Sequence, residues 1–181
     1  GTEEWGFNYL LHSSLFTCDK DSRDSLRLVG NGQNNDDQAE ANRNIIDLAD
    51  KLICQFIDKK VTTLRDAKYL CRASFKTQQA DAKLGEYYNT LQSFWRNKFE
   101  SLCIVDGTDS AKYFVCKTKV LDDTLTKACE EDSELLDAIY GLFAKVNTWI
   151  VPKKEDMVYW SNTINRWYRD EEKNEHQLDI T

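Results

Sequence analysis

Apolar residues recur at three- and four-residue spacing along most of the chain, which is the period of an amphipathic α-helix. The clearest case is segment 37–58, whose apolar residues form one face with Cys54 beside it. The same period predicts further helices over the segments 62–71, 78–102, 113–116, 120–129, 135–146 and 157–167. No alternating apolar–polar run has the length of a convincing strand. The pattern therefore predicts an all-α fold, a compact bundle of six to eight helices.

Two segments break the helical pattern. Residues 19–36 are polar and rich in turn formers, which is typical of a long exposed loop. We interpret this loop as a flexible insertion, with a binding element as the less common alternative. Residues 170–181 have little apolar surface to bury, so we expect a flexible tail there. Asp106–Asp109 is a turn signal, and a helix boundary is expected just before Pro152.

The length of 181 residues suits one hydrophobic core, so we expect a single helical domain over residues 1–169. The charge balance of 24 Lys and Arg against 31 Asp and Glu gives a net charge of −7. A phosphate backbone repels an acidic chain, so no nucleic-acid partner is expected. No window approaches the roughly 20 apolar residues of a membrane helix, so we expect no membrane span. The lack of an apolar signal segment at the start is typical of a mature or trimmed chain.

Six cysteines are spread along the expected helices, at Cys18, Cys54, Cys71, Cys103, Cys116 and Cys129. A zinc site needs four cysteine or histidine ligands at close spacing, and the shortest gap here spans 12 residues. Their even number favours three intramolecular disulfides, and the pairing stays open among about 15 possibilities. Disulfides persist only in an oxidising compartment, so we predict a secreted, extracellular protein.

Few residues suit catalysis or metal binding. His12 and His176 are the only histidines, and His12 lies in an apolar stretch where a packed histidine is the common case. The sequence has no nucleophile elbow, no phosphate-binding glycine loop and no dinucleotide fingerprint. Four aspartates gather near one turn, but they lack the ligand order of a calcium-binding EF-hand loop: Asp106, Asp109, Asp122 and Asp123. We therefore predict a non-enzymatic protein with no cofactor and no metal.

Aromatic residues are abundant, with 5 Trp, 8 Tyr and 8 Phe, and four adjacent pairs of them fall on expected helices. Neighbours on a helix point about 100° apart, so one member of a pair can lie in the core and the other near the surface. Exposed Tyr and Trp are favoured anchors at protein interfaces. The last helix is the best candidate surface for a partner, although packing is the commoner role of its aromatics. The candidate residues are Trp160, Arg166, Trp167, Tyr168 and Arg169.

About a quarter of the chain resembles a known family. The residues that carry the resemblance are Lys83-Leu84-Gly85, Gln92-Ser93-Phe94, Cys103, Gly107-Thr108-Asp109, Cys116-Lys117 and the run Val120–Lys127. This set is similar to the helical, disulfide-linked salivary proteins of blood-feeding flies that are related to odorant-binding proteins. The chain lacks the cysteine pair, three residues apart, of the odorant-binding scaffold, and no cysteine occurs in the 52 residues after Cys129. The family's pocket residues therefore do not transfer. The resemblance implies a secreted protein, and such proteins sequester host mediators such as biogenic amines or eicosanoids.

These observations predict a secreted binding protein, a salivary or parasite effector that engages a host protein to modulate haemostasis or immunity. Two alternatives stay open. One is a carrier that sequesters a small amine or lipid mediator in an interhelical pocket, and the other is a helical cytokine-like signal. A carrier is expected to have a pocket lined by aromatics, with one or two carboxylates for an amine. A protein-binding surface is expected to combine a solid core with an exposed aromatic patch.

Overall fold

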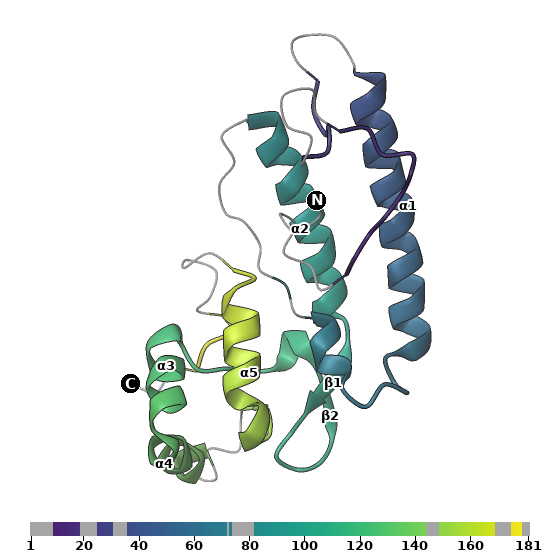
Figure 1. The fold of residues 1–181 in the computed structure, drawn as a ribbon. Coiled ribbons are helices and arrows are strands. Elements are labelled where there is room, and N and C mark those ends of the chain that lie inside the picture. The colour runs from purple at the N-terminus through teal and green to yellow at the C-terminus, as the bar shows by residue number, and fades with distance from the viewer. Residues whose placement is uncertain are drawn as a thin grey trace.

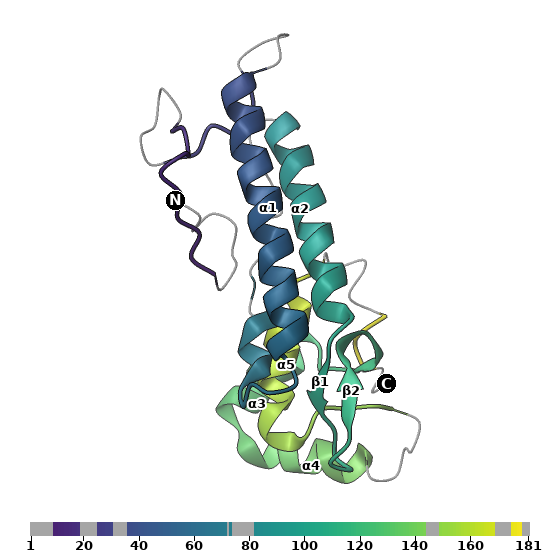
Figure 2. The same cartoon turned by 90° about the vertical axis from the view of Figure 1, so that its right-hand side faces the viewer.

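The computed structural model describes residues 9–18, 25–30, 36–71, 73, 82–143, 149–168 and 175–178. Within them the chain forms five α-helices, two short 3-10 helices and one two-stranded sheet. Their bounds are α1 Asp37–Lys60, η2 Ala67–Cys71, α2 Ala82–Glu100, β1 Cys103–Asp106, β2 Lys112–Phe114, η3 Val115–Lys117, α3 Asp123–Glu131, α4 Ser133–Phe143 and α5 Lys154–Asn165. Helices α1 and α2 run side by side and project from a lower body that holds α3, α4, α5 and the hairpin (Figure 1 and Figure 2).

Helix α1 begins at a well-defined cap. The carboxylate of Asp36 accepts hydrogen bonds from the backbone N–H groups of Gln38 and Ala39, each at 3.1 Å. Arg27 Nε donates to the same carboxylate at 2.5 Å and so ties the preceding segment to the start of the helix. Two lysines occupy the last turn, where the helix dipole favours a positive charge. The helix predicted over 37–58 is therefore confirmed, with two more residues at its end.

The main apolar core lies where α1, α2, β1 and α5 meet. Its largest buried side chains include Trp95 and Phe99 of α2 and Trp160 of α5. The ring of Trp95 also packs against Tyr9, with 5.4 Å between the centroids, and Tyr9 Oη donates to the Leu70 carbonyl at 3.0 Å. Tyr9 thereby fastens the N-terminal segment to α2 and η2.

A second apolar cluster lies among α3, α4 and α5, with the core residues Leu121, Cys129, Leu136, Ile139, Phe143, Val151, Met157 and Leu178. The chain after α5 returns to this cluster, because Val120 accepts a hydrogen bond from the N–H of Leu178 and donates one to the carbonyl of His176, both at 2.9 Å. Of the expected tail, residues 175–178 are described: Leu178 is buried, His176 and Gln177 are half-buried, and Glu175 is exposed. The others lie outside the described residues.

Residues 103–114 correct the all-α prediction, because they form an antiparallel hairpin of β1 and β2. The expected turn at Asp106–Asp109 exists, but it joins two strands and not two helices. Glycine is needed there, since a Cβ on Gly107 would come within 2.5 Å of the Tyr113 ring. The helix expected over 113–116 is replaced by β2 and the turn of η3. The strands are only four and three residues long, too short for an alternation of apolar and polar residues to stand out.

The other predicted helices are present with different ends. Helices α2, α3, α4 and α5 lie within or beside the segments 78–102, 120–129, 135–146 and 157–167, although residues 78–81 and 144–146 lie outside the described residues. The segment 62–71 forms only the 3-10 turn η2. The expected count of six to eight helices is therefore corrected to five α-helices in the described part of the chain. Most of the expected 19–36 loop lies outside that part, namely 19–24 and 31–35.

The prediction of three disulfides is wrong. All six cysteines belong to the described residues, all are free thiols, and none lies near another. Cys71 and Cys129 are buried and pack as small apolar residues, and Cys54 is half-buried. The exposed ones are Cys18, Cys103 and Cys116. The even number of cysteines led to a wrong prediction because the fold places the six thiols apart from one another. The extracellular location rested on these bridges, and it stays a prediction without that support.

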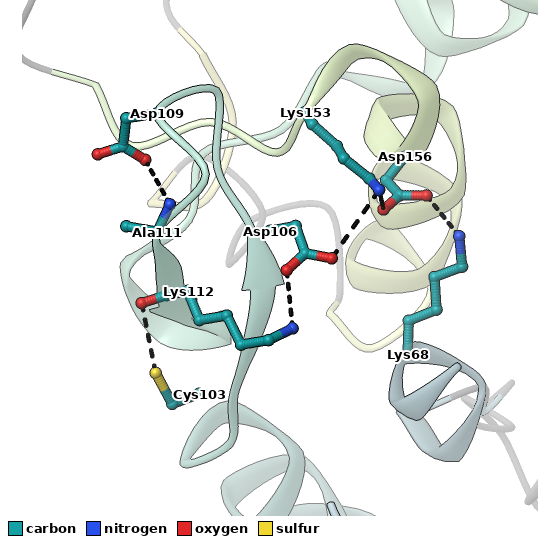
Figure 3. Close-up of polar contacts among 8 residues, drawn as sticks. All are labelled: Lys68, Cys103, Asp106, Asp109, Ala111, Lys112, Lys153 and Asp156. Carbon is teal, nitrogen blue, oxygen red and sulfur yellow. Dashed lines mark hydrogen bonds and ion pairs between the residues drawn. The ribbon is translucent and has the colours of Figure 1, made fainter. Parts of the chain in front are cut away.

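A chain of ion pairs ties the hairpin and η2 to the start of α5. Asp106 accepts from Lys112 Nζ at 2.7 Å and lies 3.9 Å from Lys153 Nζ. The Nζ atom of Lys153 lies 3.7 Å from one carboxylate oxygen of Asp156, and Lys68 donates to the other oxygen (Figure 3). Asp156 is buried, so its two cationic partners supply the compensation that a buried charge requires.

Candidate ligand-binding site

The residues predicted as a partner surface do not form an exposed patch in the described part of the chain. Trp160 and Trp167 are buried, with 0% and 3% of their surface accessible. Tyr168 is half-buried, and Arg166 is exposed. Arg169 lies outside the described residues. The two tryptophans therefore have packing roles.

The two histidines are in different surroundings. His12 is exposed. His176 stacks on the ring of Tyr168, with 4.4 Å between the centroids, and its Nε2 lies 3.9 Å from Glu100. Burial and the charge of Lys119 lower the pKa of His176, so its ring is neutral at pH 7. The tail position of His176 is thus fixed by packing.

The clustered aspartates serve the fold. Asp106 belongs to the ion-pair chain, Asp109 accepts from the N–H of Ala111 at 3.0 Å within the turn, and Asp122 caps α3 by accepting from Leu125 N–H at 2.7 Å. The described residues contain no group of three or more His, Cys, Asp or Glu placed to hold a metal. No helix among them is long and apolar enough to cross a membrane.

A cavity of about 230 Å³ opens between α1 and α2. Its wall consists of Asp47, Asp50 and Lys51 from α1 and of Tyr87, Thr90, Leu91 and Phe94 from α2. These residues recur at three- and four-residue spacing, so each helix presents them on one face. The accessible wall is almost wholly apolar. The volume lies below the roughly 300 to 1,000 Å³ of pockets for drug-sized ligands, so only a small ligand fits.

Asp50 is the most perturbed acidic group in this wall, and only 7% of it is accessible. Burial raises the pKa of its carboxyl to about 7, while a hydrogen bond from Trp95 opposes the rise and the charge of Asp47 adds to it. A single neutral donor compensates poorly for lost water, so a cation beside Asp50 would be strongly favoured.

Tyr87 belongs to the same wall, and its hydroxyl is buried. Among the described residues this hydroxyl has no hydrogen-bond partner. Burial and the charges of Asp47 and Asp50 raise the pKa of Tyr87, so the hydroxyl remains a neutral donor. A buried polar group without a partner costs roughly 1 to 3 kcal/mol and is uncommon in native proteins.

A second cavity of about 330 Å³ adjoins the first and shares Tyr87 and Thr90 with it. The rest of its wall consists of Val29, Gly30, Asp36 and Arg43 on the α1 side and of Lys83 and Glu86 on α2. This wall is mostly polar and charged. The two cavities therefore form one groove between the helices, apolar at one end and polar at the other.

Sequence reasoning did not identify this groove, although one signal was available. Asp50 falls in register with Ile46, Ile53 and Ile57, so a carboxylate interrupts the apolar face of α1. A charge at such a position needs either a partner or a function.

No protein-family model, curated protein or solved structure matches the chain. The resemblance to the salivary proteins of blood-feeding flies is thus neither supported nor refuted, and it stays a prediction.

Proposed function

We propose that this chain is a binding protein that holds a small organic amine in the cavity between α1 and α2. The observation that carries the proposal is the pairing of two carboxylates, Asp47 and Asp50, with an apolar aromatic wall. An ammonium group would lie beside the carboxylates. The hydrocarbon part would pack on Tyr87 and Phe94, whose rings also attract cations.

The charges favour an amine over an acidic lipid. The cavity wall carries two aspartates against one lysine, Lys51, and the whole chain has a net charge of −7. Both charges repel a ligand whose only charge is a carboxylate, and both attract a cation. A long acyl chain also exceeds the space of about 230 Å³. Of the two ligand classes expected for a carrier, the amine therefore fits better.

The binding should depend on pH through Asp50. The pKa of this carboxyl is about 7, so it is half ionised in neutral solution. An alkylammonium group has a pKa of about 10 and keeps its charge throughout this range. The affinity for an amine should therefore rise between pH 6 and pH 8.

Calorimetric titration with 2-phenylethylamine tests the proposal, because this probe carries one ring and one ammonium group. We expect saturable binding at pH 8 that is several-fold weaker at pH 6. The variant Asp50→Asn should bind roughly tenfold more weakly at pH 8, a loss of about 1.4 kcal/mol, and should lose the pH dependence. The control Asp37→Asn, an exposed position of α1 outside both cavities, should bind as the wild type does. Equal binding of the uncharged analogue 2-phenylethanol would contradict the proposal.

The engagement of a protein partner is a second candidate function, which the outer face of α1 favours. Leu48, Leu52 and Phe56 follow each other at four-residue spacing, with 61%, 65% and 49% of their surface accessible. Such a row of exposed apolar side chains is typical of interaction surfaces. Wild type and the variant Leu52→Ser can be compared for capture of host plasma and leukocyte surface proteins. A partner that both capture equally would not use this face.

A further inference from the structure

Two opposite charges lie one helical turn apart in the groove between α1 and α2. Asp47 lines the apolar cavity and Arg43 lines the polar one. Residues at this spacing share one face of a helix, with roughly 6 Å between their Cβ atoms. Tyr87 lines both cavities. The buried hydroxyl of Tyr87 therefore lies near the boundary where a cationic and an anionic subsite meet.

Arg43 is suited to hold a carboxylate. It is half-buried, and its Nη1 donates to the carbonyl of Leu28 at 2.5 Å. A guanidinium has about five N–H donors in a planar fork, so donors remain for a second acceptor. The bond to Leu28 also restricts the side chain before any ligand arrives, which lowers the entropy cost of binding.

The acidic groups of the polar cavity compete only in part with such a ligand. Asp36 is already paired with Arg27 and caps α1, so its charge is compensated. Glu86 is exposed to solvent, where its charge is screened. Lys83 adds a second cation to the same wall.

We infer that the groove binds an amine that also carries a carboxylate, with an aromatic α-amino acid as the simplest ligand, an inference that rests on the proposed function. The ammonium group would face Asp47 and Asp50, and the carboxylate would accept hydrogen bonds from Arg43. The ring of the ligand would occupy the apolar cavity against Phe94.

The test compares two ligands that differ only in the carboxylate, L-phenylalanine and 2-phenylethylamine, by calorimetric titration of the wild type at pH 8. We expect phenylalanine to bind roughly tenfold more tightly. The variant Arg43→Gln should weaken phenylalanine binding by about this factor and leave 2-phenylethylamine within about twofold. Arg65→Gln, an exposed position outside both cavities, is the matched control and should bind both ligands as the wild type does.

The outcomes separate this inference from the proposed function. Binding of 2-phenylethylamine with equal or weaker binding of phenylalanine would overturn the carboxylate subsite and leave the amine site intact. Absence of binding by both ligands would overturn both. An equal loss of both ligands in a folded Arg43→Gln variant would also count against the subsite. The comparison in the wild type needs no variant, so a folding defect of Arg43→Gln does not affect it.

Discussion

Buried polar groups have different surroundings in two regions of the molecule. In the lower body, Ser161 Oγ accepts from the N–H of Leu121 at 3.1 Å, and Asn165 Nδ2 donates to the carbonyl of Leu121 at 2.9 Å. In the groove between α1 and α2, the hydroxyl of Tyr87 has no partner among the described residues, and the carboxyl of Asp50 has a strongly raised pKa. Native proteins pair nearly all buried polar groups. The first set therefore stabilises the fold. The buried Trp167 Nε1 and Tyr168 Oη, just after α5, also lack partners among the described residues, so it is the position of Tyr87 and Asp50 in a cavity wall that distinguishes the groove.

Two aspartates make the same contrast sharper. Asp50 and Asp156 are almost equally buried, with 7% and 5% of their surface accessible. Asp156 has Lys68 and Lys153 as cationic partners (Figure 3). The pKa of Asp50 is instead raised by burial, to which the charge of Asp47 adds. The exposed fraction alone thus does not distinguish a carboxylate that the fold compensates from one that would favour a cationic ligand. The charge of the neighbours does.

The largest expected effect separates core aromatics from groove aromatics. Trp160 is fully buried, whereas 44% of Phe94 is accessible in the groove wall. Trp160→Ala should lower the free energy of unfolding by about 3 to 5 kcal/mol, and Phe94→Ala by less than about 1 kcal/mol. Urea unfolding followed by circular dichroism measures both. A similar loss for both variants would show that Phe94 belongs to the core and would remove the contrast.

The next effect concerns the pH dependence of stability. The pKa of Asp50 is about 7 in the folded chain, whereas the ordinary value is 3.8. Between these two pH values the carboxyl is protonated in the folded state and ionised in the unfolded state. The stabilisation of the folded state by the protonated Asp50 carboxyl is therefore full below about pH 4 and is lost as the pH rises through 7. Asp50→Asn should remove this loss and raise the free energy of unfolding at pH 8 by up to about 4 kcal/mol.

Urea titrations of wild type and variant at pH 4.5 and pH 8 measure this difference. Asp156→Asn is the matched control. This variant removes the negative charge that pairs with Lys68 and Lys153, so it should destabilise the chain at pH 8. A lower stability of Asp50→Asn than of the wild type at pH 8 would mean that Asp50 is compensated within the fold.

The sequence predicts those parts of the fold that depend on local pattern. Helix α1 was predictable because its apolar face repeats over six turns and its N-cap is an aspartate. The hairpin was not, because the side chains of its short strands show no clear alternation and its turn depends on the contact between Gly107 and the Tyr113 ring. The disulfide prediction failed for a related reason, since a count of cysteines contains no information about distance.

The groove depends on how two helices face each other. Asp50 was visible in the sequence as a break in an apolar face, but its raised pKa results from burial in the folded chain, to which the charge of Asp47 adds. The period of one helix does not determine which residues of another lie opposite. Trp160 and Trp167 show the converse case, because these two tryptophans of the candidate partner surface are buried.

The smallest expected effect isolates single hydrogen bonds in the two regions. Asn165→Ala removes the donor to the Leu121 carbonyl and the acceptor for Gln177 Nε2, so it should cost about 1 to 3 kcal/mol of unfolding free energy. Tyr87→Phe removes a hydroxyl without a partner in the described residues and should change that free energy by less than about 0.5 kcal/mol. Both variants can be measured by urea unfolding without ligand. A cost above 1 kcal/mol for Tyr87→Phe would mean that the protein itself satisfies this hydroxyl.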